Sequence, residues 1–288
     1  ACTAKENVLN NLSIFVRQEG TLCNFSVKES WVILSPIEQS IKQKIEAVGT
    51  PLKDWDINIY RGILTGYNEA FIIDGATKDR LIEEDPKSAE IIRPILRGRD
   101  IKRYGYEFAD LWLINTHNGI KEKGIKPINI KDYPAIKKHL DNFYPQLEKR
   151  ADKGDTPYNL RNCAYMEDFY KQKIIWSDIS TEPEFVFVDE PLFFNNTCYM
   201  MTGAGLGIIG ILNSKIMKWY FPKIATDLGS GGTRYFKQFV ELLPIPNDKT
   251  LLIELEEIIK LSTYNSIDNI LYEKYKFSKS EIKIIESQ

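Results

Sequence analysis

The sequence is poor in the residues on which many catalytic and metal centres depend. It has two histidines, His117 and His139, and four cysteines that lie far apart without a C-x-x-C pair. These few residues supply little for a zinc site and give no disulfide framework. Scattered cysteines of this kind are typical of a reduced cytoplasmic protein, and that is the localisation we predict.

Signals for export or membrane insertion are also scarce. The opening ACTAKENVLNNLSIFVRQEG has neither a basic start nor a long apolar block. The longest uncharged stretch, residues 191–214, has 24 residues but contains Asn195, Asn196, Thr197 and four glycines. Such a composition is a poor membrane span. We therefore expect a buried strand followed by a buried helix there, and no contact with a membrane.

Several catalytic signatures are missing. None of the thirteen prolines adjoins another, so the Pro-Pro loop of adenine-N6 methyltransferases is absent, as are G-x-S-x-G, Walker and H-E-x-x-H motifs. Glu281-Ile-Lys283, with Asp268 upstream, faintly resembles a nuclease metal site, but acid and base pairs are commonplace in a helical tail. We predict that this chain contains no catalytic centre, metal site or cofactor of its own.

One motif favours the opposite interpretation. Residues 200–215, MMTGAGLGIIGILNSK, contain a literal G-x-G-x-x-G from Gly205 to Gly210. A dinucleotide fold needs this loop early in a βαβ unit, with an acidic residue closing the next strand, whereas Asp227 follows no apolar strand. We expect the glycines to permit close helix packing or a sharp turn. A small-molecule enzyme that binds a nucleotide or S-adenosylmethionine at Gly203–Gly210 is the alternative.

Charge is unevenly distributed along the chain. The formal net charge is −2, yet residues 91–173 carry 17 basic and 11 acidic side chains, and residues 214–238 carry five basic and one acidic. Between these islands, residues 174–213 have five acids and no Lys or Arg. Two basic islands could form one face that meets phosphates, although charge runs also occur as ordinary solvated surface.

The hydrophobic pattern indicates a mixed α+β protein with a central β-sheet region and a C-terminal helical tail. Ser35, Pro36 and Glu38 begin a helix that ends at Gly49. Helices are also predicted at 77–85, 87–96, 132–151 with a kink at Pro145, and 207–221. Strands are predicted at 57–59, 71–73, 111–115, 173–179, 184–188 and 192–201. After Pro246 we predict two or three amphipathic helices.

We divide the chain into an N-terminal segment and helix (1–50), a recognition domain (51–246) and a helical tail (247–288). Within them, six segments stand in an order that resembles the C-terminal specificity domain of TaqI-like DNA adenine methyltransferases and related type IIG restriction-modification enzymes. They are IYRGILTGYNEAFIID, AEIIRPILRGRDIKRY, YNLRNCAYMEDFYKQKIIWSDIS, FFNNTCYMM followed by GILNSKIMKWYF, GGTRYFKQFVELLPIP, and IDNILYEKYKFSKSEIKIIE. The order, rather than any one motif, carries the resemblance.

The resemblance implies target recognition in a bacterial phage-defence system. The chain would read base edges of duplex DNA while a methyltransferase domain of the same polypeptide acts on a flipped adenine. That domain would use S-adenosylmethionine, and Mg²⁺ would be needed if the parent protein also cleaves DNA. A stand-alone specificity subunit that pairs with a separate methyltransferase is the alternative with the same fold.

Three segments hold the side chains that suit DNA contact. Arginine forks read guanine, amides read adenine, and glycine-flanked donors suit phosphate. The candidates are Arg97, Arg99, Lys102 and Arg103; Lys153, Tyr158, Asn159, Arg161 and Asn162; and Ser230, Gly232, Thr233 and Arg234.

Each of the three segments also has a purely structural interpretation. The first arginines could pair with acids such as Asp100 or Glu107, Tyr158 and Leu160 could pack in the core, and residues 230–234 could be a hairpin connection. We expect the LTGYNEAF segment to be structural, with Gly66 and Asn68 fixing a turn and Phe71 in the core.

Overall fold

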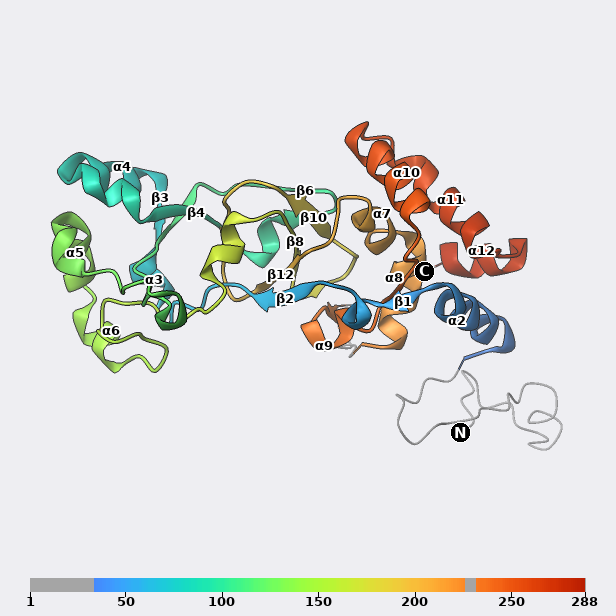
Figure 1. Cartoon of the computed structure of the whole chain (residues 1–288), viewed down its shortest axis with the longest axis horizontal. Helices are drawn as coiled ribbons and strands as arrows, with labels where there is room; N and C mark the ends of the chain where they lie inside the picture. The colour runs from blue at the N-terminus through green and yellow to red at the C-terminus, as the bar shows by residue number, and fades with distance from the viewer. Residues whose placement is uncertain (1–33, 226–231, 288) are drawn as a thin grey trace, which may run out of the picture.

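A four-stranded sheet in the middle of the molecule separates two hydrophobic cores in the computed structural model, which describes residues 34–225 and 232–287 (Figure 1). Its strands lie in the order β10 (Phe185–Val188), β8 (Lys173–Ser177), β12 (Cys198–Thr202) and β2 (Asn58–Arg61), with every neighbouring pair antiparallel. The mixed α+β class predicted from the pattern is confirmed.

Both faces of this sheet are covered, which explains why its strands read as continuous apolar runs. On β8, Ile174 and Trp176 enter one core and Ile175 enters the other; on β12, Met201 and Met200 divide in the same way. Successive side chains of a strand point to opposite faces, so a sheet covered on both sides needs apolar residues at consecutive positions. The acid-rich, lysine-free segment 174–213 thus supplies the buried centre of the fold.

Helices form the first core together with one face of the sheet, at the right-hand end of the molecule in Figure 1. They are α2 (Pro36–Val48), α7 (Ile208–Leu212), α8 (Lys215–Tyr220), α10 (Lys249–Lys260), α11 (Ile267–Lys274) and α12 (Lys279–Glu286). The predicted capping box of Ser35 and Glu38 is present at the start of α2. The predicted C-terminal helices are confirmed as three, and α2 packs against α12.

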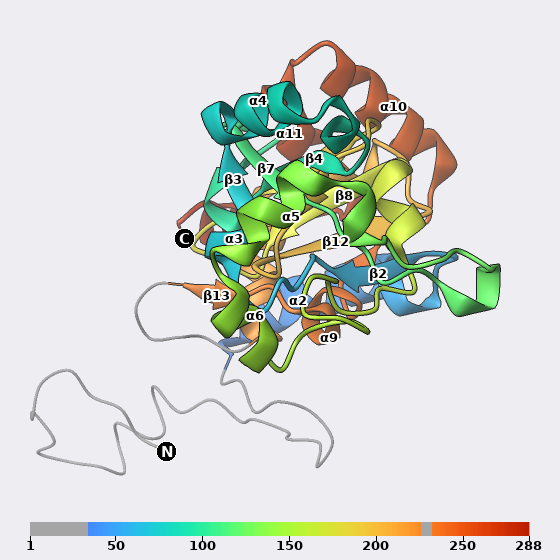
Figure 2. The same ribbon diagram turned by 90° about the vertical axis from the view of Figure 1, so that its left-hand side faces the viewer.

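The second core lies at the opposite end, which faces the viewer in Figure 2. A second sheet has the order β11 (Phe193–Phe194), β4 (Ile92–Leu96), β7 (Leu111–Ile114) and β3 (Ile72–Asp74), with β11 parallel to β4. The helices of this end are α3 (Asn68–Phe71), α4 (Gly75–Glu84), α5 (Pro134–Asp141) and α6 (Tyr144–Lys149).

Short elements complete the fold. β1 (Thr50–Pro51) pairs with β14 (Pro244–Ile245), β9 (Ile179–Ser180) with β13 (Thr233–Arg234), and β5 (Ile101–Lys102) with β6 (Gly105–Tyr106); α9 spans Lys237–Val240. The β1–β14 pair joins the two ends of the predicted 51–246 domain, although the division at residues 50 and 246 stays a prediction. No helix among the described residues is long and apolar enough to cross a membrane.

The structure corrects three of the predicted helices. Residues 87–96 form a single 3-10 turn, Pro86–Glu90, and then strand β4, because the Ile-rich run pairs with β7 in the second core. The helix predicted at 132–151 is interrupted at Asn142 and Phe143, and Pro145 stands in the first turn of α6.

The third correction concerns residues 207–221, which form two helices. Asn213 leaves the helix to exchange two hydrogen bonds with the backbone of Phe185, both of 2.8 Å, and the Ser214 hydroxyl caps α8 by accepting from the Met217 amide. The Asn213 side chain thus satisfies both backbone groups of Phe185, and the Ser214 hydroxyl accepts from an amide that the break leaves free at the start of α8.

Candidate nucleic-acid interface

The basic segment 97–106 folds as a 3-10 turn (Gly98–Asp100) followed by the β5–β6 hairpin. Arg97 turns inward and donates to Asp100 through Nη2 at 2.7 Å and Nε at 3.0 Å. Burial raises the pKa of Asp100, but hydrogen bonds from the Arg97 side chain and backbone outweigh it, and the net pKa lies below 3.8. Arg97 is therefore paired with a neighbouring acid, as in the structural alternative that the sequence left open for this segment.

The other basic side chains of this hairpin differ from Arg97. Arg99 is exposed, Lys102 is half-buried and donates through Nζ to the Arg99 carbonyl at 2.9 Å, and the Arg103 guanidinium lies 5.2 Å from the Tyr104 ring centre. Tyr104 in turn stacks on Tyr264 at 4.1 Å. The hairpin tip is thus packed toward the C-terminal helices, whereas Arg99 stays open to solvent.

The second predicted segment is a loop that a buried arginine holds in place. Arg150 is 8% exposed and donates to the carbonyls of Thr65, Pro157 and Asn159. Its guanidinium lies 4.4 Å from the Phe71 ring centre, and burial lowers its pKa to about 10. A guanidinium that bridges three carbonyls fixes loop 151–162 against the Thr65–Gly66 turn, so this loop is preorganised.

Within this loop the predicted side chains face in different directions. Asn159 is buried and bonds to the Ile128 carbonyl and the Thr156 hydroxyl, so its amide serves the loop itself. The Tyr158 hydroxyl donates to Asp141 at 2.6 Å, and the Leu160 side chain is buried. The remaining three are exposed: Lys153, which donates to the Glu148 carbonyl; Arg161, which lies 3.2 Å from Asp152; and Asn162, which accepts from Asn118.

The third segment is described only from Gly232 onward, and Ser230 lies outside the described residues. Gly232 and Thr233 are buried, and β13 places Thr233 opposite Ser180. Arg234 is half-buried, with its guanidinium 5.4 Å from the Phe236 ring centre and its Nε without a hydrogen-bond partner in the described part of the chain. Of these candidates, Arg234 is the one that offers a side-chain donor.

Arg61, which was not among the predicted DNA-contact residues, contacts two of the segments around this region. Arg61 ends β2, donates through Nε to the Asn196 carbonyl at 2.7 Å, and lies 3.6 Å from Asp178. Its side chain is 49% exposed, and its guanidinium is 5.7 Å from the Tyr199 ring centre. Asp178 also feels the positive charge of Arg234, although its burial dominates and raises its pKa.

The turn Asn195–Thr197 brings the first segment to the same place. The Thr197 hydroxyl accepts from the Gly98 amide at 2.8 Å, while the Thr197 carbonyl accepts from the Asp178 amide at 2.8 Å. The Asn195–Thr197 turn therefore contacts both Arg61 and the 3-10 turn Gly98–Asp100, which contains Arg99.

Two stacked tyrosine rings lie between the end of β2 and Arg161. Tyr60 and Tyr165 stack with 4.3 Å between ring centres, and Tyr165 lies in the electrostatic field of both Arg161 and Arg61. Lys53, Tyr60 and Lys237 border a hollow of about 180 Å³ that also includes Glu241. Tyr60 and Arg61 point to opposite faces of the sheet, but both lie along its edge because β2 is an edge strand. We call Arg61, Arg161, Arg234, Tyr60 and Tyr165 the β2 surface. In Figure 1, β2 lies along the lower side of the molecule beside α9.

One signal in the sequence pointed to Arg61. It is the charged residue that ends the strand pattern of INIYRG, in a segment already singled out for its resemblance. The contacts that give it a place in the β2 surface come from Asn196 and Asp178, which lie more than a hundred residues away along the chain.

The glycine motif of residues 205–210 has a packing role. A Cβ added to Gly207 would lie 2.0 Å from the Leu252 carbonyl oxygen, and one added to Gly210 would touch Leu255 and Ile259 at 3.5 Å. Gly203 has a φ of +92°, which marks a sharp turn after β12. The predicted role in close helix packing is confirmed, with α10 as the partner. This crowding does not fit a phosphate at Gly207.

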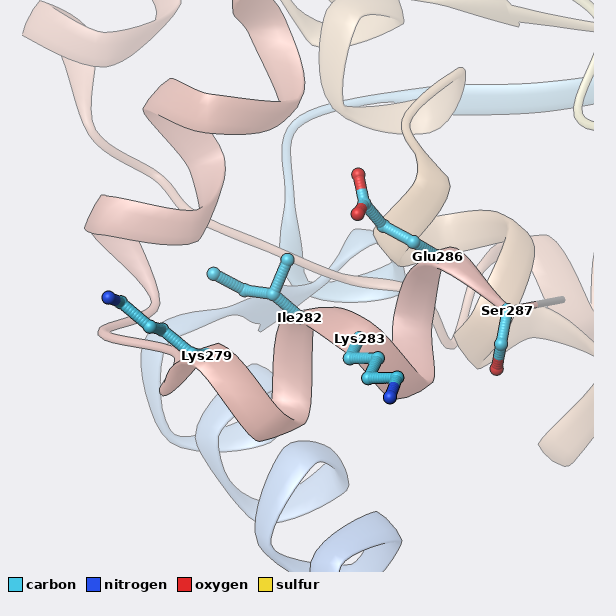
Figure 3. A pocket seen from close by; sticks show the side chains of 5 residues that line it. All are labelled: Lys279, Ile282, Lys283, Glu286 and Ser287. Carbon is cyan, nitrogen blue, oxygen red and sulfur yellow. The ribbon is translucent and has the colours of Figure 1, made fainter.

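The remaining features are modest. Figure 3 shows an open hollow on α12, lined by Lys279, Ile282, Lys283, Glu286 and Ser287. Glu281 accepts from Ser40 and Lys44 and so joins α12 to α2. Among residues 34–225 and 232–287, no cluster of three acidic, histidine or cysteine side chains could hold a metal ion. Of the cysteines, Cys163 and Cys198 are free thiols, while Cys2 and Cys23 lie outside the described residues.

Comparison with curated proteins finds bacterial methyltransferases of similar sequence. The type II methyltransferase M.BstVI of Geobacillus stearothermophilus is 24% identical over 275 residues, which cover 91% of this chain and 47% of that protein. The type II methyltransferase M.BanIII of Aneurinibacillus aneurinilyticus is 24% identical over 277 residues, covering 85% of this chain and 46% of that protein. The chain thus spans about half the length of these relatives.

Solved structures with a similar fold belong to restriction-modification enzymes. The type IIL enzyme MmeI, whose structure was determined in complex with DNA, superposes with a TM-score of 0.55 at 16% identity, over 83% of this chain and 32% of that one. The type IIG restriction endonuclease BpuSI gives 0.51 at 17% identity, over 78% and 27%.

A family profile described as the TaqI-like C-terminal specificity domain matches residues 93–245, slightly more than half of the chain. The match extends from β4 through the basic hairpin, loop 151–162 and β13 to β14. This chain therefore belongs to the family of TaqI-like C-terminal specificity domains.

Proposed function

We propose that this chain binds duplex DNA sequence-specifically, as the target-recognition domain of a bacterial type IIG restriction-modification enzyme or adenine-specific DNA methyltransferase. The observation that carries the proposal is the β2 surface, where three arginines from distant segments lie near aromatic rings: Arg61 near Tyr199, Arg234 near Phe236 and Arg161 near Tyr165. Guanidinium groups neutralise phosphates and read guanine, and rings contact bases or sugars. Membership of a specificity-domain family supports the same conclusion.

The chemistry on DNA would belong to other parts of a longer polypeptide. The methyltransferase relatives are about twice the length of the matched region, which supports S-adenosylmethionine binding and methyl transfer outside this chain. Mg²⁺ would be required only if the parent also cleaves DNA. Within this chain, the β2 surface would hold the duplex while the partner domain takes the flipped adenine. A specificity subunit that pairs with a separate methyltransferase would use the same surface.

Binding to random duplexes at two salt concentrations, followed by sequencing of the bound fraction, tests this proposal. We expect an enriched motif and an affinity that falls steeply with salt, because each neutralised phosphate releases counterions. Replacing Arg61, Arg161 and Arg234 together with alanine should reduce the slope of log affinity against log salt. The reduction should be as much as about 0.9 for each phosphate that the variant no longer neutralises.

A matched triple variant controls for the loss of charge itself. Arg80, Lys138 and Lys260 are exposed and form ion pairs on α4, α5 and α10. Replacing these three with alanine removes the same formal charge away from the β2 surface, and we expect a much smaller change of the slope. Equal effects of the two triple variants would show that general charge, and not this surface, binds DNA.

A further inference from the structure

The geometry points to Arg61 as the residue of the β2 surface that reads a base, and the base that its guanidinium suits is guanine. This inference rests on the proposed function and deepens it, because it assigns one position of the recognised sequence to one side chain. Guanine presents two acceptors, O6 and N7, in the major groove, and the two terminal N–H groups of an arginine match them in a bidentate contact.

The backbone of Arg61 is fixed on both sides. β2 pairs with β12, and Arg61 stands opposite Tyr199. The next residue, Gly62, passes so close to the Asn195–Thr197 turn that an added Cβ would lie 2.0 Å from the Asn195 carbonyl oxygen. The Gly62 amide also donates to the Cys198 carbonyl at 2.9 Å. A base-reading side chain needs such a rigid base, because positional freedom weakens a bidentate contact.

The guanidinium of Arg61 is oriented while its outer edge stays open. Nε donates to the Asn196 carbonyl at 2.7 Å, which fixes the plane of the group, and the Tyr199 ring lies 5.7 Å away. Nη2 is 3.6 Å from Asp178, longer than a hydrogen bond, and Nη1 has no hydrogen-bond partner among the described residues. With the side chain about half exposed, the Nη1–Nη2 edge is available to a ligand.

Arg97, Arg150 and Arg161 lack this combination. Arg97 directs its fork at Asp100, Arg150 is buried among carbonyls, and Arg161 has a carboxylate 3.2 Å away. Asp178 would act on Arg61 as a positioning residue, since it lies beside Nη2 and is itself held by the Thr197 carbonyl. Contact with a phosphate requires only a nearby positive charge. A bidentate contact with a base requires a guanidinium of fixed orientation, which the Nε hydrogen bond provides.

Two substitutions separate base reading from phosphate contact. Arg61→Lys keeps the charge and removes the planar fork, so we expect the salt dependence of binding to be kept. Because lysine can still donate to guanine, the preference for guanine at a single position of the motif should fall by at most about 5- to 150-fold. Arg61→Gln should move the preference at that position from guanine to adenine, because a glutamine amide pairs with adenine N6 and N7.

The measurement is selection from random duplexes by the full chain, its two Arg61 variants and Arg80→Lys, which should leave the motif unchanged. Thermal unfolding of each variant establishes that it is folded. If both Arg61 variants recover the wild-type motif, the inference is wrong while the proposed function stands. If the wild-type chain enriches no motif, the proposed function fails, and the inference with it.

Discussion

The basic hairpin 97–106 and the end of β2 differ in what their arginines contact. The hairpin is the richer in charge, yet its first arginine is bound twice by Asp100, three residues away. The end of β2 holds a single arginine, whose Nε donates to the Asn196 carbonyl, while Nη2 lies 3.6 Å from Asp178 and Nη1 has no hydrogen-bond partner among the described residues. Arg150 is the extreme case, with its guanidinium enclosed by three carbonyls.

The number of arginines in a segment is therefore a poor guide to how many guanidinium donors stay available to a ligand. A guanidinium has five N–H donors, and each donor bound within the protein is one that a ligand cannot use. Arg97 and Arg150 use their donors to stabilise the fold, whereas Arg61 and Arg161 are held in position with donors left exposed. We call these two kinds structural and exposed arginines.

The largest effect is expected for Arg150→Ala. The substitution removes the hydrogen bonds from Arg150 to the carbonyls of Thr65, Pro157 and Asn159 and the packing against Phe71, so we expect a decrease of about 3 kcal/mol in the free energy of unfolding. Urea denaturation measures it. Arg161→Ala, a change in the same loop at an exposed side chain, is the control and should alter stability by less than about 0.5 kcal/mol. Similar decreases in the free energy of unfolding for the two variants would show that Arg150 is no more important for stability than Arg161.

A smaller decrease, about 2 kcal/mol, is expected for Asp100→Asn, because Arg97 then lacks its charged acceptor. The wild-type interaction should also depend on pH. The folded pKa of Asp100 lies below its unfolded value of 3.8, so the stabilisation is present above that pH and is lost as the pH falls through the folded pKa.

Urea unfolding of both proteins at neutral pH and in acid measures this dependence. The difference between wild type and Asp100→Asn should shrink in acid. A constant difference would mean that the carboxylate charge does not contribute.

The smallest effect is on DNA binding by single variants. Arg161→Ala should weaken affinity a few-fold at moderate salt and reduce the salt slope by about 0.9, as expected when one phosphate is no longer neutralised. Arg97→Ala, tested at a temperature where the variant is folded, should leave the slope unchanged, since that guanidinium is bound to Asp100. Fluorescence anisotropy with a labelled duplex measures both. A larger change of the salt slope for Arg97→Ala than for Arg161→Ala would show that Arg97, and not Arg161, contacts the phosphate.

Local patterns predicted much of the fold. The capping box at Ser35 and Glu38, the strands at 173–188 and the three C-terminal helices follow from contacts within a few residues, which a sequence displays directly. Two of the three misassigned helices are segments where tertiary contacts prevail: residues 92–96 pair with β7, and Asn213 bonds to Phe185. Neither partner is visible from local periodicity.

The candidate site was predicted in part. Sequence reasoning selected Arg99, Arg161 and Arg234, which keep exposed or half-buried guanidinium groups. It also selected Asn159, which is buried and bonded within its loop, and it omitted Arg61. Residue type indicates which chemistry is possible, but the direction of a side chain depends on what packs around it.

By itself, the sequence determined the mixed α+β class and the order of segments that identifies a specificity domain. Only the tertiary structure decided that one sheet would divide two cores, that α10 would fill the space beside Gly207, and that Arg61 would be aimed by Asn196. The physical reason is distance along the chain. Hydrogen bonds and packing between residues tens to more than a hundred positions apart, such as Gly207 with Leu252 and Arg61 with Asn196, form only when the chain has folded.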